Sequence, residues 1–138
     1  MSEVAAVEAA NDEFYAAFEA ADLDRMGAVW DDEAEVVCVH PGWDALRGRA
    51  RVMRSWAVIF ANTPYIQFFL SDVESTVSGD LAVVTCAENI LTAPGEPGGD
   101  AKVVSTNVFR LVDGSWRMTL HHGSPVMRQI AEEDPADE

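Results

Sequence analysis

Apolar residues recur every three to four positions in three stretches of the chain, and each stretch predicts an amphipathic helix. The first covers residues 4–21, and Asp22 can cap a second, shorter helix over residues 23–30. The third covers residues 49–62. It is expected to end there because Pro64 follows, and the residue before a proline avoids helical backbone angles.

The remaining stretches favour β-strands. An apolar run at about residues 34–40 ends at His40, and Pro41-Gly42 then turns the chain. Four further runs follow, at residues 65–78, 81–93, 101–112 and 115–122. Gly79-Asp80 and Asp113-Gly114 are hairpin signals between them. Consecutive strands joined by hairpins predict an antiparallel meander, and three N-terminal helices can cover one of its faces.

The predicted fold class is therefore α+β, with the helices packed on an antiparallel sheet. We expect a single domain over residues 1–127, because the length fits one hydrophobic core. Residues 128–138 are dominated by Asp and Glu, and we expect them to form a disordered acidic tail.

The charge of the chain disfavours two classes of partner. Its 138 residues include 24 acidic and 9 basic side chains, which gives a formal net charge of −15. Nucleic acids and anionic membrane surfaces both require basic patches, so neither is expected. The N-terminus lacks the features of a signal peptide, and no run approaches the roughly 18 apolar residues of a membrane span. We expect a cytoplasmic protein whose two cysteines, Cys38 and Cys86, are buried free thiols.

Alternation along the last strand predicts which of its side chains point inward. Trp116, Met118 and His122 belong to the mostly apolar set, whereas His121 belongs to the other set. The apolar set should face the helices. His122 is therefore expected inside the fold and His121 outside it.

The two preceding strands contribute further candidates. Arg110 must face outward, which places Asn107 and Phe109 inside. Residues 81–93 are apolar on both faces, so Glu88 is left open between a pocket and a dimer interface.

Two histidines are candidates for acid–base chemistry. An unperturbed histidine side chain has a pKa of about 6.5, so a histidine such as His40 or His122 is a candidate to exchange a proton at neutral pH. The alternative for each is a structural role, in which hydrogen bonds hold the local backbone. Trp43 and Trp56 are either core or the apolar wall of a ligand site.

No metal ion or other cofactor is expected. The histidines and Glu88 lack the spacing of a ligand set.

Several short segments occur in an order that resembles one known family. They are Ala21-Asp22-Leu23-Asp24, Trp30-Asp31-Asp32-Glu33-Ala34, His40-Pro41-Gly42, Arg47-Gly48, Ser55-Trp56 with Ile59-Phe60, Asp113-Gly114-Ser115-Trp116-Arg117 and His122-Gly123-Ser124. Together they span residues 8–126 and resemble the NTF2-like superfamily, in particular its SnoaL-like and ketosteroid-isomerase-like branch. The resemblance implies a cone-like, curved sheet closed by helices around an apolar pocket. It also implies a homodimer through the outer sheet face.

Ketosteroid isomerases, which this branch includes, differ from the chain at their catalytic positions. Where they carry a tyrosine donor on the first helix, the comparison places Phe14, with Tyr15 one residue away. Where they carry a general-base aspartate before a proline, this chain has His40. Asn107 is the nearest polar candidate for their second donor. Because phenylalanine cannot donate a hydrogen bond, and such a donor contributes about 2.7–4 kcal/mol, steroid isomerisation by that route is not expected.

Three functions remain open. The first is a SnoaL-like lyase or isomerase in which His40 takes a proton from a small apolar carbonyl compound. His122 or Asn107 would polarise the carbonyl oxygen, and Glu88 could orient a histidine. The second is a non-catalytic ligand-binding or self-association domain. The third, an epoxide-hydrolase-like mechanism, ranks last because Glu88 is the one carboxylate expected to be buried. The residues expected to contact the ligand are Tyr15, Trp43, Trp56, Phe60, Glu88, Asn107 and Phe109.

Overall fold

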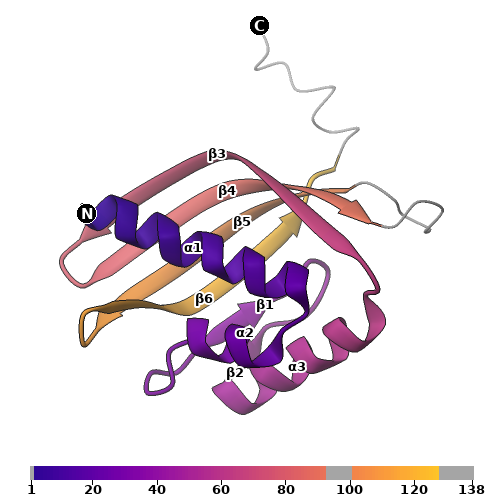
Figure 1. The fold of residues 1–138 in the computed structure, drawn as a ribbon, viewed down its shortest axis with the longest axis horizontal. Helices are drawn as coiled ribbons and strands as arrows, with labels where there is room; N and C mark the ends of the chain where they lie inside the picture. The colour runs from indigo at the N-terminus through magenta and orange to yellow at the C-terminus, as the bar shows by residue number, and fades with distance from the viewer. Residues whose placement is uncertain (1, 93–100, 128–138) are drawn as a thin grey trace, which may run out of the picture.

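The computed structural model describes residues 2–92 and 101–127, in which three helices pack on one face of a curved six-stranded sheet (Figure 1). The helices are α1 (Glu3–Ala20), α2 (Leu23–Val29) and α3 (Arg49–Asn62). The strands are β1 (Val37–Val39), β2 (Leu46–Arg47), β3 (Ile66–Ser78), β4 (Leu81–Thr92), β5 (Ala101–Val112) and β6 (Ser115–Pro125). The α+β prediction is confirmed. The predicted acidic tail, residues 128–138, lies outside the described residues.

Short polar side chains begin the first two helices. The hydroxyl of Ser2 accepts a hydrogen bond from the Ala5 amide, and the carboxylate of Asp22 accepts one from the Arg25 amide, both at 3.1 Å. Each satisfies an amide that helix geometry leaves without a backbone partner. α1 then lies across the sheet (Figure 1). Its Phe14 side chain is fully buried.

The strands follow the order β2-β1-β6-β5-β4-β3. β3 to β6 form the predicted antiparallel meander. β1 instead pairs parallel with β6, with Val39 opposite His122, and the two-residue strand β2 extends this edge. The sheet is therefore mixed rather than wholly antiparallel. No hairpin joins β1 to β6, since they are far apart in the sequence, and so no turn imposes an antiparallel direction on this pair.

Charged side chains hold the connection between α2 and β1. The carboxylate of Asp31 is fully buried and pairs with Arg110 at 2.8 Å, while also accepting the amides of Glu33 and Ala34. Arg49 donates to the carbonyl oxygen of Gly27 at 2.8 Å, which satisfies an acceptor at the end of α2. These contacts fix where β1 begins and, through it, the position of the residues that follow.

A bulge interrupts β6. Val108 and Phe109 are neighbours in β5, but their partners in β6 are Leu120 and Met118, so Thr119 has no counterpart. The Thr119 hydroxyl donates to the Val108 carbonyl oxygen at 3.3 Å. An extra residue in one strand shifts its inward–outward alternation by one position from that point on.

The bulge decides which histidine points inward. His121 lies opposite Asn107 on the inner face and is 3% exposed, whereas His122 lies opposite Thr106 and is exposed. The prediction that His122 is inside and His121 outside is therefore wrong. It assumed an unbroken alternation from Trp116 onward, and the bulge breaks it between Met118 and His121.

The core between the helices and the sheet is rich in aromatic rings. Phe14 of α1 meets Trp56 of α3 edge to face, with centroids 5.6 Å apart, and Phe18 packs on the same indole at 4.9 Å. Phe109 is fully buried, as predicted.

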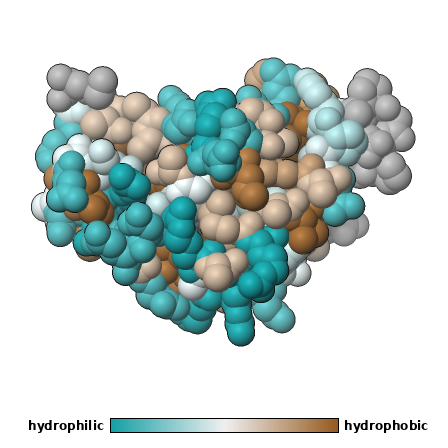
Figure 2. Space-filling view, turned by 60° about the horizontal axis from the view of Figure 1, so that its bottom comes forward, coloured by the Kyte–Doolittle hydropathy of each residue, from teal (hydrophilic) through white to brown (hydrophobic). Residues whose placement is uncertain are grey.

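One face of the molecule shows hydrophilic and hydrophobic residues interspersed (Figure 2). In the described part of the chain, no helix is long and apolar enough to cross a membrane.

Candidate functional site

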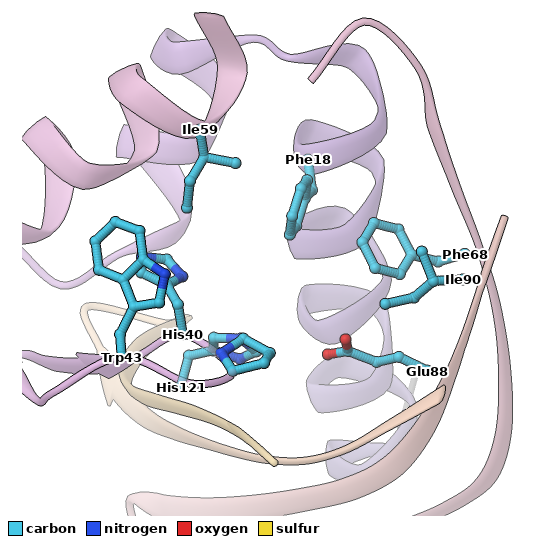
Figure 3. A pocket seen from close by; sticks show the side chains of 9 residues that line it. Phe18, His40, Trp43, Ile59, Phe68, Glu88, Ile90 and His121 are labelled. Carbon is cyan, nitrogen blue, oxygen red and sulfur yellow. The ribbon is translucent and has the colours of Figure 1, made fainter. Parts of the chain in front are cut away.

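A cavity of about 240 Å³ opens among α1, α3, the sheet and the turn after β1 (Figure 3). We call it the cavity throughout. Its lining consists of Phe18, His40, Pro41, Trp43, Ile59, Phe68, Glu88, Ile90 and His121. Most of this wall is apolar, and the three ionisable side chains converge on the space between the rings (Figure 3). A mostly apolar hollow with a few convergent polar groups is typical of a small-molecule site.

His40 reaches the cavity from the end of β1 and is 4% exposed. Its Nε2 lies 2.9 Å from the Ser55 hydroxyl, which itself donates to the Val52 carbonyl oxygen at 2.7 Å. A serine hydroxyl has a single hydrogen, so Nε2 must donate and Nδ1 must carry the lone pair. Burial lowers the pKa of His40 to about 4, which keeps the ring neutral at pH 7.

His121 reaches the cavity from β6. Its Nδ1 lies 2.6 Å from the amide oxygen of Asn107, the residue directly opposite in β5. Its ring packs on Phe14, with centroids 4.7 Å apart. Burial, reinforced by the neighbouring histidines His40 and His122, lowers the pKa of His121 to about 3. This ring is neutral as well.

Glu88 faces His121 across the cavity from β4 (Figure 3) and is 3% exposed. Its Oε2 accepts hydrogen bonds from the Tyr15 and Ser105 hydroxyls, both at 2.5 Å. Burial raises the pKa of the carboxyl group, and these two donors only partly offset it. Glu88 thus belongs to the pocket, which resolves the alternative that the two-sided strand pattern left open.

The sequence candidates divide into three groups. His40, Trp43 and Glu88 line the cavity. Five others do not line the cavity within the described part of the chain: Tyr15, Trp56, Phe60, Asn107 and Phe109. Of these, Asn107 and Phe109 lie in the buried inner layer of the sheet. His122 lies on the opposite face of the sheet.

Tyr15 differs most from expectation. It was predicted to contact a ligand, but its hydroxyl bonds to Glu88 behind the cavity wall. Burial raises its pKa, so the phenol keeps its proton at pH 7.

Sequence reasoning missed His121 and the walls formed by Phe18, Phe68 and Ile90. The three apolar residues looked like ordinary core positions, because a cavity leaves no mark on hydrophobic periodicity. His121 had a local signal in the pair His121-His122, since at most one of two adjacent strand residues can face inward. Alternation counted from Met118 predicted that His122 faces inward, whereas His121 does.

The cavity wall carries no positively charged lysine or arginine among the lining residues of the described chain. Within residues 2–92 and 101–127, no group of three or more His, Cys, Asp or Glu side chains is placed to hold a metal ion. Two imidazoles and a carboxyl group among the lining side chains can transfer protons and form hydrogen bonds.

Comparisons with known proteins agree with the fold. The SnoaL-like domain family matches residues 7–128. The crystal structure of a proposed dehydratase of the NTF2-like family from Streptomyces avermitilis is 46% identical, with a TM-score of 0.85 over 91% of this chain and 96% of that one. A proposed calcium/calmodulin-dependent protein kinase type II association domain from Thiobacillus denitrificans is 36% identical, with a TM-score of 0.77 over 87% and 94%.

A further relative is the F-box protein SKIP8 of Arabidopsis thaliana. It is 28% identical over 122 residues, which are 88% of this chain and 50% of the F-box protein. This chain therefore spans about half the length of that relative. With a family match over nearly the whole described chain and the same three-helix, curved-sheet fold, the protein belongs to the SnoaL-like domain family of the NTF2-like superfamily.

Proposed function

We propose that the cavity catalyses the elimination of water from a small, uncharged hydroxy-carbonyl compound, as a lyase. One observation carries the proposal. A neutral imidazole and a carboxyl group with a raised pKa face each other across an apolar space (Figure 3). Groups whose environments favour an unprotonated base and a protonated acid at the same pH form an acid–base pair. The Streptomyces avermitilis relative, itself a proposed dehydratase, supports this reaction class.

Each residue takes one role in the proposed step. His121 Nε2 removes the proton from the carbon next to the carbonyl group, and the electron pair of that C–H bond forms the new C=C bond. The hydroxyl group on the next carbon leaves with the proton of Glu88, as water. The products are the unsaturated carbonyl compound, water, a His121 imidazolium and a Glu88 carboxylate. A proton moving from His121 to Glu88 through cavity water restores both groups.

The lining also indicates the substrate class. An anionic substrate would bring its charge next to Glu88 without a lysine or arginine to compensate it. The aromatic and aliphatic walls favour an apolar ring or chain, and the volume of about 240 Å³ limits its size.

An exchange experiment in deuterated water tests the proposal. With a panel of uncharged 3-hydroxy ketones and esters, we expect deuterium to enter the position next to the carbonyl group and the conjugated product to absorb in the ultraviolet. Proton magnetic resonance would follow both changes at pH 7. Carboxylic acids of the same carbon skeleton serve as the control, since the apolar lining has no lysine or arginine to pair with a carboxylate and should exclude them. Ligand binding without exchange or product across the panel would contradict the lyase and leave a binding protein.

We also propose that the protein forms a homodimer through the sheet face that carries no helix. The observation behind this second candidate is a set of apolar side chains on that face. Phe69, Val83, Leu91 and Val104 are 54%, 38%, 37% and 47% exposed. Their strand partners place them on the side opposite the cavity. Burying apolar surface contributes about 25 cal/mol per Å², which favours a second copy over water.

Sedimentation velocity of a charge variant tests the dimer. Val104→Lys is expected to shift the protein from dimer to monomer, because a buried unpaired charge at an interface is costly. Val58→Lys is the matched control, since Val58 is 51% exposed but lies on α3. A monomeric wild-type protein at high concentration would contradict the proposal, as would equal behaviour of the two variants.

A further inference from the structure

A continuous chain of buried hydrogen bonds runs behind the cavity wall from His121 to Glu88. His121 Nδ1 lies 2.6 Å from Asn107 Oδ1, and Asn107 Nδ2 lies 3.2 Å from the Tyr15 hydroxyl. That hydroxyl lies 2.5 Å from Glu88 Oε2. None of the four side chains is more than 4% exposed. The two groups that face each other across the cavity are thus also joined through the protein.

The direction of this chain follows from counting hydrogens. Tyr15 has a single hydroxyl hydrogen, and the Glu88 oxygen at 2.5 Å accepts it in preference to the Cys86 sulfur at 3.6 Å. The tyrosine oxygen can therefore only accept from Asn107, which must present its NH₂ group on that side. A second contact agrees, because Asn107 Nδ2 also donates to Asn11 Oδ1 at 2.8 Å.

The orientation of Asn107 in turn decides the state of His121. With its NH₂ group held by Tyr15 and Asn11, Asn107 can turn only its carbonyl oxygen toward the imidazole. That oxygen accepts and cannot donate, so a neutral His121 must carry its hydrogen on Nδ1. Nε2 then carries the lone pair on the cavity side.

The carboxyl end of the chain is ordered in the same way. Tyr15 and Ser105 both donate to Oε2 of Glu88, so this oxygen carries no proton of its own. A protonated Glu88 therefore holds its proton on Oε1. No described residue forms a hydrogen bond with Oε1.

We propose that Asn107, held in orientation by Tyr15 and Asn11, is a positioning residue that fixes His121 as the Nδ1–H tautomer with a bare Nε2 in the cavity. The inference rests on the proposed function only in giving that nitrogen the role of the base. The tautomer itself is a property of the free protein.

The fold builds this arrangement from three separate elements. Asn11 and Tyr15 are four residues apart on α1 and so lie on one face of the helix. Asn107 and His121 are direct partners across β5 and β6, a register that exists because of the bulge at Thr119. A core asparagine with two donors and one acceptor satisfied in this way has a single orientation available.

Nitrogen magnetic resonance of the imidazole groups, without any substrate, tests the proposal. In the wild-type protein at pH 7, His121 is expected to show a protonated Nδ1 and an unprotonated Nε2. Asn107→Asp keeps an acceptor oxygen at the same place, so the Nδ1–H form is expected to persist. Asn107→Leu removes the acceptor, and the hydrogen is expected to move to Nε2. Ser55→Ala is the control, because it removes the partner of His40 and leaves that of His121 intact.

Two results would overturn the inference: an Nε2–H tautomer in the wild-type protein, or an unchanged tautomer in Asn107→Leu. If Asn107→Leu does not fold, the wild-type and Asn107→Asp spectra decide alone. Under the proposed lyase activity, Asn107→Leu should also lower kcat by about 10- to 100-fold, with Asn107→Asp retaining more activity. An inactive wild-type protein that shows the expected tautomer would contradict the lyase and leave this inference standing.

Discussion

Lowering the pH from about 6.5 toward 4.5 is expected to reduce the free energy of unfolding through the two buried histidines. Burial lowers the pKa of His40 to about 4 and that of His121 to about 3 in the folded protein. Both are below the value of about 6.5 in an unfolded chain. As the pH falls, the unfolded state therefore binds protons first, and folding loses stability. The stabilisation is complete above about pH 6.5 and declines below it.

The expected loss in the free energy of unfolding is large for a small domain. Each buried histidine contributes a slope of about 1.4 kcal/mol per pH unit over this range, or about 2–3 kcal/mol between pH 6.5 and 4.5. Glu88 acts in the opposite direction, because its raised pKa makes the folded state bind its proton more readily as the pH falls. A comparison between variants separates the histidine contribution from that of the carboxyl groups.

Urea unfolding of the wild-type protein and of His121→Asn across this pH range measures the effect. Asparagine can still donate to Asn107 but does not titrate. The stability advantage of the wild-type protein over the variant is expected to shrink as the pH falls. His122→Asn is the matched control, since His122 is an exposed neighbour in the same strand, and this variant should keep the loss of stability that the buried rings cause as the pH falls. Parallel curves for both variants would mean that His121 is not held neutral by the fold.

The His121→Asn and Glu88→Gln variants are expected to lose about 100- to 10,000-fold in kcat for the proposed elimination, the usual contribution of a positioned acid or base. The first loses the unprotonated nitrogen and the second loses the proton. Each new side chain can still form the main hydrogen bond of the original one, and Gln also keeps the shape of Glu. Because neither change alters the apolar walls, KM should change much less than kcat.

Steady-state kinetics on the most active compound of the panel would measure these losses. His122→Asn again serves as the control and should keep wild-type activity, because that side chain lies on the far side of the sheet. His40→Asn tests the base predicted from the sequence. A larger loss for His40→Asn than for His121→Asn would move the role of base to His40.

Local chemistry made the elements predictable. The helix predicted over residues 49–62 has the bounds of α3, because hydrophobic periodicity and the following proline act within the helix itself. The strand predicted over residues 101–112 likewise has the bounds of β5, since turn residues punctuate the chain. The position of His40 at the end of the first strand follows from its turn residues.

The candidate site depended on contacts between distant segments. Glu88 could not be assigned to a face, because both faces of its strand are apolar and only the packing of α1 distinguishes them. Tyr15 and Phe14 are adjacent in the sequence. Only the docking of α1 sends the hydroxyl of one to Glu88 and packs the ring of the other on His121.

The sequence by itself determined the α+β class, the order of the helices and meander strands, and a histidine at the end of β1. Those features depend on periodicity, turn residues and charge, which act over a few residues. The tertiary structure alone decided the parallel edge, the cavity and the exchange of His122 for His121. A bulge one residue long leaves no periodic signal, since it is stabilised by the neighbouring strand and the core it faces, and yet it reverses every side chain beyond it.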